Sequence, residues 1–339
     1  MTVPVRKPRL GFLGVGWIGR HRLAAIAEAQ IADIVALADS TKANLEEATA
    51  LAPEAELLAS YGDLLEQPLD GVVIATPSAL HAEQSIRALE QGLAVFCQKP
   101  LARTGAEVRA VIAAARKADR LLGVDLSYRH ERGIVAMRDM ILRGDLGRIF
   151  AVDLVFHNAY GPGKPWFYDR ALSGGGCVID LGIHLVDAAL WMLHSPVARI
   201  SSALYAEGRA LPPGAHAIED YASVRLELES GTLVNLACSW KLHAGQDAVI
   251  EASFYGTDGG ASLRNIGGSF TQFRTEAFTN TTRRTLAEPP DAWGGGAILA
   301  WTRQLQESRR FHREIETHAE VADILDRIYG APEPEPSLR

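Results

Sequence analysis

The sequence predicts an α/β protein with two domains. The first is a doubly wound domain with a parallel sheet, and the second is an α+β domain with a large, mostly antiparallel open sheet. The 339 residues are enough for two domains, and 47% hydrophobic with 22% charged residues is typical of a globular chain. Strand-like and helix-like segments alternate up to residue 127, which indicates a parallel sheet covered by helices. Beyond it, apolar and polar residues alternate as in antiparallel strands.

In the first domain, residues 1–127, short apolar runs predict buried strands, and a segment of helical composition follows each of the first four. Right-handed crossovers between such strands place helices on both faces of the sheet. The predicted strands are 10–15, 34–38, 72–75, 93–97 and 121–126, and the predicted helices are 21–30, 43–51, 79–91 and 107–118.

The second domain is predicted to cover residues 128–330, followed by a Pro/Glu-rich tail, 331–339, of the composition expected for a disordered segment. Helices are expected at 133–142 and 179–193, and a last helix is expected to end near Tyr329. The predicted strands are 148–157, 222–228, 232–240, 248–255 and 260–264.

Charge and cysteine content narrow the class of protein. A net charge of −7 and a pI near 5.8, with no basic stripe, argue against a nucleic-acid partner. We expect no membrane-spanning segment and no membrane partner. Cys97, Cys177 and Cys238 are odd in number and far apart in the sequence, which favours a reducing, cytoplasmic location over a disulfide framework.

A glycine motif indicates a dinucleotide site. Gly14, Gly16 and Gly19 follow the first predicted strand and open a helix, so a pyrophosphate could approach the backbone at the helix N-terminus. Asp39 ends the second strand, 20 residues past Gly19, where a carboxylate would bind ribose hydroxyls and repel a 2′-phosphate. This predicts NAD as the cofactor, with NADP less favoured because Lys42 is close by.

Two further strand ends carry polar residues in this domain. Thr76, Pro77 and His81 follow the third strand, and Gln98-Lys99-Pro100 follows the fourth. Ligands of open α/β sheets bind beyond the carboxyl ends of the strands, so Lys99 is a candidate for the reaction site. An X-Pro bond at Pro100 can be cis, which would direct Lys99 into a cleft. The alternative is a surface lysine next to a helix-start proline.

In the second domain a triglycine, 174–176, precedes a helix in which Asp180 and His184 are four residues apart and share a face. Histidine exchanges protons near neutral pH, and a carboxylate can orient it. The alternative is a surface ion pair or a core histidine. Asp187 and His194 could add metal ligands, but no zinc-type spacing recurs, so no metal is expected.

The order of these motifs resembles the Gfo/Idh/MocA family of NAD(P)-dependent sugar and polyol oxidoreductases. The motifs are "GFLGVGWIGRHR", "TPSALH", a Lys-Pro dipeptide and "GGGCVIDLGIHLVD". The resemblance implies a Rossmann domain, and a C-terminal sheet through which the chain forms a homodimer or homotetramer. It implies catalytic roles for Lys99, Asp180 and His184. Implied cofactor contacts are Gly14, Gly16, Trp17, Ile18, Gly19, Asp39, Thr76, Pro77, His81, Gln98 and Lys99. The family usually has glutamate where this chain has Gln98, which removes a carboxylate beside Lys99.

The expected reaction is hydride transfer between a nicotinamide and a secondary alcohol or ketone of a sugar, inositol or related polyol. His184 would act as general base, Asp180 would support it, and Lys99 would stabilise the developing alkoxide. Expected substrate contacts are these three together with Tyr128, Arg129, His157, Asn158, Tyr160, Lys164 and Trp166. Trp293 is a weaker candidate, for a mobile flap. Rival hypotheses are a non-catalytic NAD-binding regulator, an NAD-dependent glycosidase and, least favoured, a metal-dependent lyase.

Overall fold

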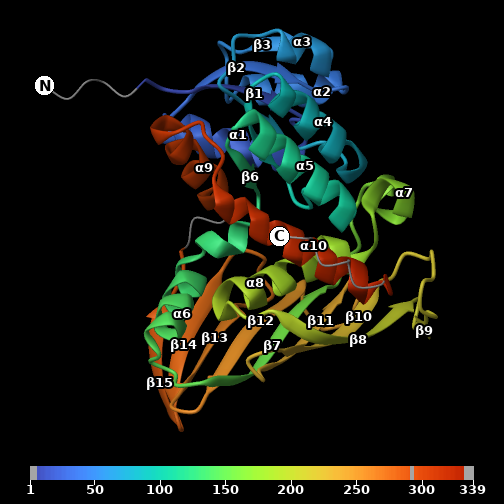
Figure 1. Cartoon of the computed structure of the whole chain (residues 1–339), viewed down its shortest axis with the longest axis vertical. Coiled ribbons are helices and arrows are strands. Elements are labelled where there is room, and N and C mark those ends of the chain that lie inside the picture. The colour runs from blue at the N-terminus through green and yellow to red at the C-terminus, as the bar shows by residue number, and fades with distance from the viewer. Residues whose placement is uncertain (1–5, 291–293, 332–339) are drawn as a thin grey trace, which may run out of the picture. The chain divides into compact units, whose positions relative to one another are not determined.

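A computed structural model describes residues 6–290 and 294–331 of the chain (Figure 1). The chain divides into two units: Met1–Ser127 with Gly294–Ala319, and Tyr128–Trp293 with Glu320–Arg339. The second domain was expected to be continuous from residue 128 to 330, and this is wrong for one segment. Residues 294–319 return to the first unit because the apolar face of one helix packs on its sheet. Apart from Ala331, the tail lies outside the described residues.

The first unit holds a six-stranded parallel sheet in the order β3-β2-β1-β4-β5-β6. The order reverses direction between β1 and β4, and ligands of such sheets bind at this point, beyond the carboxyl ends. The strands are β1 (Arg9–Leu13), β2 (Asp33–Ala38), β3 (Glu56–Leu58), β4 (Gly71–Ile74), β5 (Ala94–Cys97) and β6 (Leu122–Val124). The helices are α1 (Trp17–Ala29), α2 (Lys42–Thr49), α3 (Tyr61–Leu65), α4 (Ser78–Glu90), α5 (Gly105–Ala118) and α9 (Gly296–Glu307).

The central strands of this sheet are apolar throughout because helices cover both faces. Every residue of β4 and β5 is buried. Apolar residues of α1, α2 and α9 share one core with β1 and β5, while α4 packs against β4, β5 and α5. The glycine motif, Thr76 and Lys99 follow β1, β4 and β5, so all three lie at the carboxyl edge of the sheet.

Two glycines of the sheet make room for one large side chain of α9. A Cβ on Gly71 would lie 2.9 Å from Trp301 Cη2, and a Cβ on Gly123 would lie 2.6 Å from Trp301 Cδ1. Trp301 is only 4% exposed and also packs on the Phe96 ring, with 5.6 Å between ring centroids. The fit between Trp301 and these glycines attaches a distant part of the chain to the first unit.

The second unit holds a nine-stranded sheet in the order β15-β14-β13-β12-β7-β11-β10-β8-β9. Every described pair is antiparallel except β7 with β11, which is parallel. The strands are β7 (Ile149–Asn158), β8 (Val197–Ala206), β9 (Arg209–Ala210), β10 (Tyr221–Leu228), β11 (Leu233–Ser239), β12 (Ala248–Gly256), β13 (Gly260–Asn265), β14 (Phe273–Thr279) and β15 (Thr282–Ala287).

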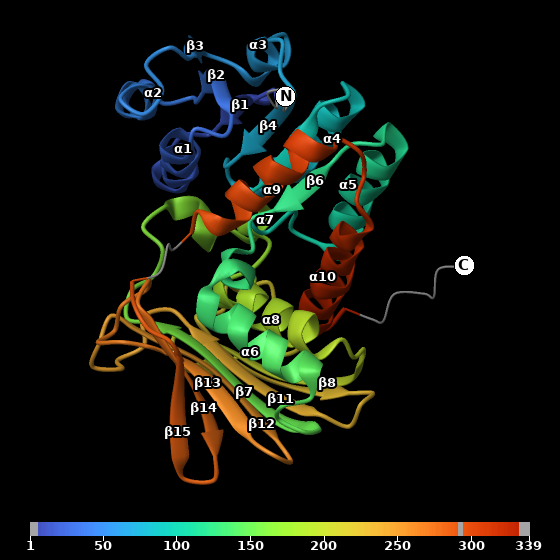
Figure 2. The same cartoon turned by 90° about the vertical axis from the view of Figure 1, so that its left-hand side faces the viewer.

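One face of this sheet is covered by helices, which explains the alternation of its strands. α6 (Arg132–Arg143) and α8 (Ile183–Leu193) lie over this face in both views (Figures 1 and 2). In β10 every second residue from Ala222 to Leu228 is buried. The unit also contains the short helices η1 (Ser127–His130, from its second residue), η2 (Pro165–Tyr168), α7 (Arg170–Ser173) and η3 (Val178–Gly182), and most of α10 (Thr317–Ile328).

One helical run, Arg170–Leu193, is long and apolar enough to be compared with a membrane-spanning helix. By length and composition alone this run would qualify, with a mean hydropathy of 1.6 in its most apolar window. However, 72% of that window is buried inside the protein, and the run includes the triglycine and the η3 turn. We therefore assign it to the core of the second unit.

Trp301→Ala should cost about 3–5 kcal/mol in the free energy of unfolding, because it leaves a cavity beside Gly71 and Gly123. Trp301→Phe should cost much less, since Trp301 Nε1 is buried without a hydrogen-bond partner in the described part of the chain. Chemical denaturation measures both. Leu80→Ala, at an exposed position of α4, is the control and should stay within about 0.5 kcal/mol. Equal losses for Trp301→Ala and Leu80→Ala would contradict the role of Trp301.

Candidate active site

The turn between β1 and α1 is shaped by two glycines. Gly14 has a φ of +85°, and a Cβ there would lie 2.6 Å from the Ala75 carbonyl oxygen. A Cβ on Gly19 would lie 2.1 Å from the Gly14 carbonyl oxygen, so α1 can approach the strand ends only with glycine at both positions. Gly16 precedes α1 and has no side chain to cap it. This backbone cradle, at a helix N-terminus, fits the pyrophosphate of a dinucleotide.

Asp39 is fixed by its neighbours at the end of β2. Its carboxylate accepts hydrogen bonds from the backbone amides of Val15 and Thr41, both at 2.8 Å, and from Asn44 Nδ2 at 3.1 Å. These donors are neutral, so the carboxylate keeps its negative charge toward the nucleotide site. Nucleotide specificity at this position depends on that charge.

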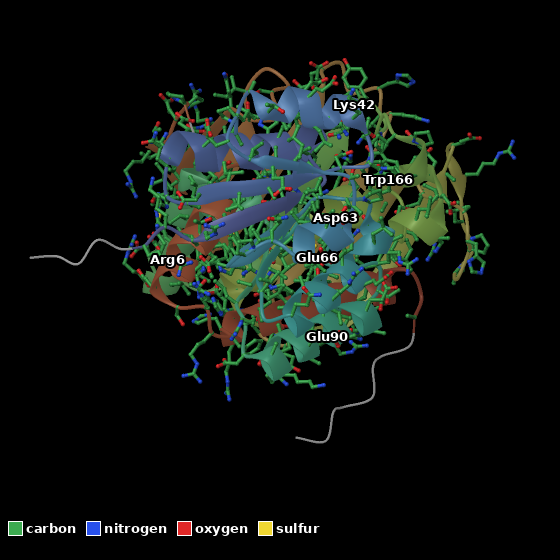
Figure 3. The ribbon with its side chains drawn as sticks, turned by 90° about the horizontal axis from the view of Figure 1, so that it is seen from above. Arg6, Lys42, Asp63, Glu66, Glu90 and Trp166 are labelled. Carbon is green, nitrogen blue, oxygen red and sulfur yellow. The ribbon has the colours of Figure 1, made fainter. Side chains whose placement is uncertain are left out.

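Two cations near Asp39 are already paired with glutamates of α2. Lys42 lies at the outer surface of α2 (Figure 3), with its side chain 89% exposed and Nζ 3.5 Å from Glu46. Arg20 forms an ion pair with Glu47 at 2.7 Å. Lys42 is therefore expected to do little to attract a 2′-phosphate, and Asp39 is expected to govern the choice between NAD and NADP.

His81 connects the two loops that follow β4 and β5. The ring is 1% exposed, with Nε2 2.7 Å from the Thr76 carbonyl oxygen and Nδ1 2.7 Å from the Pro100 carbonyl oxygen. Burial lowers the pKa of His81, while the two carbonyl contacts oppose that shift because an imidazolium donates from both nitrogens. The described contacts of His81 connect Thr76 to the Lys99-Pro100 segment, and its predicted contact with the cofactor stays a prediction.

Gln98 belongs to a buried polar network that the sequence did not indicate. Its Oε1 accepts a hydrogen bond from the Lys99 amide at 2.9 Å, and its Nε2 donates to Asp125 Oδ2 at 2.8 Å. Asp125 and Arg22, 1% and 3% exposed, form an ion pair through the same oxygen. A buried carboxylate, that of Asp125, thus lies beside Gln98. The Lys99–Pro100 peptide is cis, as the sequence allowed, and Lys99 is half-buried.

The triglycine of the second unit makes room for a buried glutamate. Glu219 is fully buried, and its carboxylate accepts hydrogen bonds from the Gly176 and Val178 amides at 3.0 and 2.9 Å and from the Tyr329 hydroxyl at 2.7 Å. A Cβ on Gly176 would lie 2.0 Å from the Glu219 carbonyl oxygen, and one on Gly175 would lie 2.1 Å from the Tyr329 hydroxyl oxygen. Burial raises the pKa of Glu219, and these donors oppose the shift. The start of the following helix is therefore fixed.

Asp180 and His184 lie on the π-helical turn η3 and on α8, which follows it. From Gly175 to Ala189 these are the only two residues that are not buried. Asp180 Oδ2 accepts a hydrogen bond from Trp240 Nε1 at 3.0 Å, a contact that the sequence did not predict. π-helical turns occur often at functional sites. The helix thus presents two titratable side chains from an otherwise buried run.

Aromatic rings surround His184. Tyr128 is half-buried, and its ring lies 5.0 Å from the His184 ring at 63°, with the Phe156 ring 6.3 Å from that of His184. Arg129 makes two hydrogen bonds to Asp187, of 2.9 and 2.5 Å, with 11% and 3% of the side chains exposed. Tyr128 therefore lies beside the predicted base, while Arg129 fastens η1 to α8. Among the described residues, no group of three or more His, Cys, Asp or Glu could hold a metal ion.

The other predicted substrate residues lie along β7 and the loop after it. His157 accepts from or donates to Ser239 Oγ at 2.8 Å and stacks on Tyr221, and burial lowers its pKa. Asn158 Oδ1 is buried without a partner among the described residues. Trp166 (labelled in Figure 3) stacks on Phe167 with 3.8 Å between ring centroids, Lys164 is exposed, and Tyr160 donates to Asp247 at 2.6 Å. Trp293 lies outside the described residues. Substrate contact by these residues stays a prediction.

Comparison with known proteins fits this arrangement. Residues 8–126 match the model of an oxidoreductase family with an NAD-binding Rossmann fold, and residues 134–262 match a GFO/IDH/MocA C-terminal domain. The chain belongs to the Gfo/Idh/MocA family. It is thus an oxidoreductase of the NAD-binding type, and the resemblance inferred from its motifs is confirmed.

Similar proteins include two sugar or polyol dehydrogenases. D-glucoside 3-dehydrogenase of Escherichia coli (strain K12) is 29% identical over 71% of this chain and 76% of its own. Inositol 2-dehydrogenase of Agrobacterium fabrum (strain C58 / ATCC 33970) is 30% identical over 75% of this chain and 73% of its own. The fold matches the crystal structure of GenD2, from gentamicin A biosynthesis, in complex with NAD. The TM-score is 0.80, the identity 21%, and the match covers 97% of this chain and 95% of that one.

Gln98→Glu should destabilise the first unit by about 3 kcal/mol, because it buries a second carboxylate beside Asp125. The loss should grow as the pH rises, since the extra carboxyl has a raised pKa in the folded protein and is favoured there only while protonated. Asp125→Asn alone should also destabilise, because Arg22 loses its partner. The double variant restores a single carboxylate and should recover most of the loss. Denaturant unfolding of all four proteins measures this, and strictly additive losses would contradict it.

Proposed function

We propose that the protein is an NAD-dependent dehydrogenase or reductase that acts on a secondary alcohol, or the matching ketone, of a sugar, inositol or related polyol. The observation that carries the proposal is that Asp180 and His184 are half-buried, whereas every other residue from Gly175 to Ala189 is buried. Burying this run while leaving one acid and one base accessible suits a proton-transfer site. The names of the two similar dehydrogenases support the substrate class.

The roles of the residues follow from their surroundings. His184 exchanges the hydroxyl proton of the substrate, and Asp180, oriented by Trp240, stabilises the charged imidazole. Lys99 donates a hydrogen bond to the reacting oxygen, with its backbone fixed by Gln98 and the His81–Pro100 contact.

The cofactor would be held by residues of the first unit. The Gly14–Gly19 turn and the start of α1 fit the pyrophosphate, and Asp39 fits the ribose hydroxyls. When bound, the nicotinamide supplies the redox chemistry of the reaction. Trp17, which is 59% exposed, and Ile18 begin α1 and are proposed contacts, as are Thr76 and Pro77 after β4.

We also propose a homodimer or homotetramer in the cytoplasm. Assembly would use the face of the nine-stranded sheet opposite α6 and α8, where residues of β7 and β10 such as Phe150, which is 46% exposed, and Arg225 point outward. The three buried cysteines are free thiols, although Cys177 and Cys238 have their sulfur atoms 3.8 Å apart, and this suits a reducing compartment.

His184→Asn should lower kcat by about a hundredfold to ten-thousandfold, because the general base is lost while the side chain keeps its polarity. Asp180→Asn should cost less, since it supports the transfer, and Lys99→Met should lower kcat as well. NAD binding, measured by fluorescence titration, should change little in all three. The assay follows nicotinamide absorbance over aldoses, inositols, amino sugars and lactones, and release of an aglycone without net NADH would indicate the glycosidase. Near-normal turnover by His184→Asn would remove His184 from the mechanism.

Asp39 should make NAD the preferred cofactor over NADP in kcat/KM and in dissociation constant. Asp39→Ser removes the charge that repels a 2′-phosphate. Loss of a repulsion of about 1.4 kcal/mol would lower the preference for NAD over NADP about tenfold. Lys42→Met is the control and should leave the ratio nearly unchanged, because Lys42 is exposed and paired with Glu46. A preference for NADP that Lys42→Met abolishes would show that the lysine outweighs the carboxylate.

A further inference from the structure

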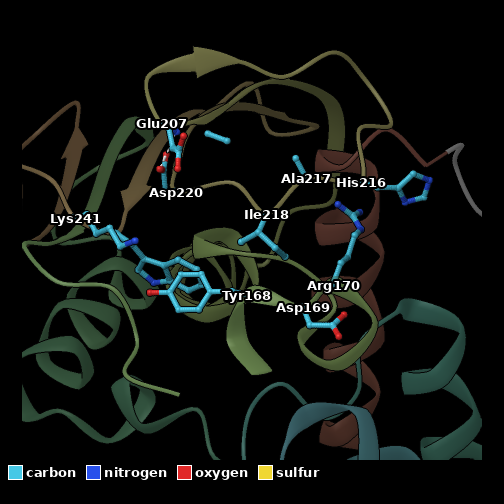
Figure 4. Close-up of a pocket in the computed structure, with 11 residues that line it drawn as sticks. Tyr168, Asp169, Arg170, Glu207, His216, Ala217, Ile218, Asp220 and Lys241 are labelled. Atoms are coloured by element: carbon cyan, nitrogen blue, oxygen red, sulfur yellow. Dashed lines mark hydrogen bonds between the residues drawn. The ribbon is translucent and has the colours of Figure 1, made fainter. Parts of the chain in front are cut away.

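The second unit contains a pocket of about 900 Å³ that none of the predicted site residues lines (Figure 4). Its volume lies within the range of small-molecule sites, roughly 300–1,000 Å³. The walls come from the η2–α7 segment, the end of β8, the residues before β10 and the end of β11. The lining residues are Tyr168, Asp169, Arg170, Ala206, Glu207, His216, Ala217, Ile218, Asp220, Trp240 and Lys241.

Two parts of the pocket lining, Trp240 and the segment 218–220, also contact the helix that carries Asp180. Trp240 lines the pocket and donates its indole N–H to Asp180. Ile218 and Asp220 line it on either side of Glu219, whose carboxylate fixes the start of the same helix. A molecule in the pocket would therefore contact Trp240, the residue that donates a hydrogen bond to Asp180.

One side of the pocket is an aromatic corner with an ammonium group. The Tyr168 ring meets Trp240 edge to face, with 5.7 Å between centroids, and Lys241 Nζ lies 5.1 Å from the Tyr168 ring centroid. In Figure 4 the Lys241 side chain runs alongside the Tyr168 ring. Lys241 has a φ of +58°, a left-handed conformation that side chains with a Cβ rarely adopt. Such strained positions cluster at functional sites.

A close backbone contact supports this corner from the neighbouring loop. A Cβ on Gly161 would lie 2.1 Å from the Tyr168 hydroxyl oxygen and 3.0 Å from Lys241 Cε. Only glycine at this position lets the loop pack against both side chains. The corner is therefore shaped by the backbone around it.

The charges of the pocket select its ligand. Asp169, Glu207 and Asp220 bring three carboxylates against the two cations Arg170 and Lys241, so the pocket does not favour a phosphate or another anion. Arg170 is further engaged by the Ala215 carbonyl oxygen at 3.1 Å and by the Tyr329 ring. Aromatic faces suit the C–H surface of a pyranose, and carboxylates and an ammonium suit its hydroxyls.

We propose that this pocket is a second sugar subsite, which holds a neutral, non-reacting ring of a glycoside or oligosaccharide while another ring reacts at His184. The proposal rests on the proposed function. Contacts of the second ring with Tyr168 and Lys241 would add binding affinity without taking part in the reaction. The subsite should therefore lower KM for substrates with two rings and leave kcat unchanged.

The test compares substrates that share a reacting ring: D-glucose, methyl β-D-glucoside and cellobiose, with the full-length protein and NAD. Tyr168→Ala and Lys241→Gly remove the corner, and glycine keeps the left-handed backbone at position 241. His243→Gly, exposed in the same loop, is the matched control. We expect a KM for cellobiose at least tenfold below that for glucose. Both pocket variants should abolish this advantage with kcat and the glucose KM within about twofold, and His243→Gly should keep it.

Titration calorimetry with cellobiose on the wild type and on Lys241→Gly separates this proposal from the proposed function. Cellobiose binding that Lys241→Gly weakens, with no turnover of any sugar, would keep the subsite and overturn the dehydrogenase. Turnover with equal KM for one-ring and two-ring substrates, unaffected by either variant, would overturn the subsite. So would dissociation of an oligomer by Tyr168→Ala in light scattering, since a second copy of the chain would then fill the pocket.

Discussion

A buried carboxylate, that of Glu219, is the constraint on which the second unit's site depends. It accepts hydrogen bonds from the backbone amides of Gly176 and Val178 and from the Tyr329 hydroxyl. It therefore takes the place of the side-chain N-cap that η3 lacks. A buried acid is costly unless such donors surround it, and any side chain at Gly176 would block the approach. The triglycine therefore serves this carboxylate, and the accessible positions of Asp180 and His184 follow from it.

In the first unit a different network of buried polar groups fixes the position of Lys99. Asp125, at the end of β6, binds Gln98 and pairs with Arg22 of α1, while His81 holds the Pro100 carbonyl. The backbone of Lys99 is thus fixed on one side by Gln98 and on the other by the contact between His81 and the Pro100 carbonyl. Glutamine at position 98 is consistent with this network, because it accepts from the Lys99 amide and donates to a carboxylate at once. A glutamate cannot donate when ionised.

The sequence predicted what is local and missed what is brought together by folding. The fold class and the nine elements expected in the first unit were recoverable from apolar runs, because strands such as β4 and β5 are buried on both faces. Strand β8 was missed because mostly exposed residues give it no alternation, and α9 because the Pro/Gly-rich stretch before it resembles a loop. Asp180, His184 and Lys99 stand beside motifs, whereas Glu219 lies 43 residues from Gly176 and carries no such signal. Asp125 directly follows β6, and a polar residue at the carboxyl end of a strand is a signal from which its role could have been predicted.

The segment from Ile218 to Asp220 has two structural roles: it fixes the start of a helix and it lines the pocket. Its central residue is buried and fixes the start of the helix that carries Asp180, and its outer residues line the pocket, as does Trp240. Trp240 is positioned by its backbone, since its amide donates to the Asp220 carbonyl oxygen at 2.7 Å. Of the side chains on the pocket side, Tyr168 packs edge to face on Trp240, and Lys241 lies against the Tyr168 ring. A substitution at Lys241 would therefore alter the proposed subsite while Asp180 keeps its position, because backbone amides and one buried carboxylate hold the helix in place.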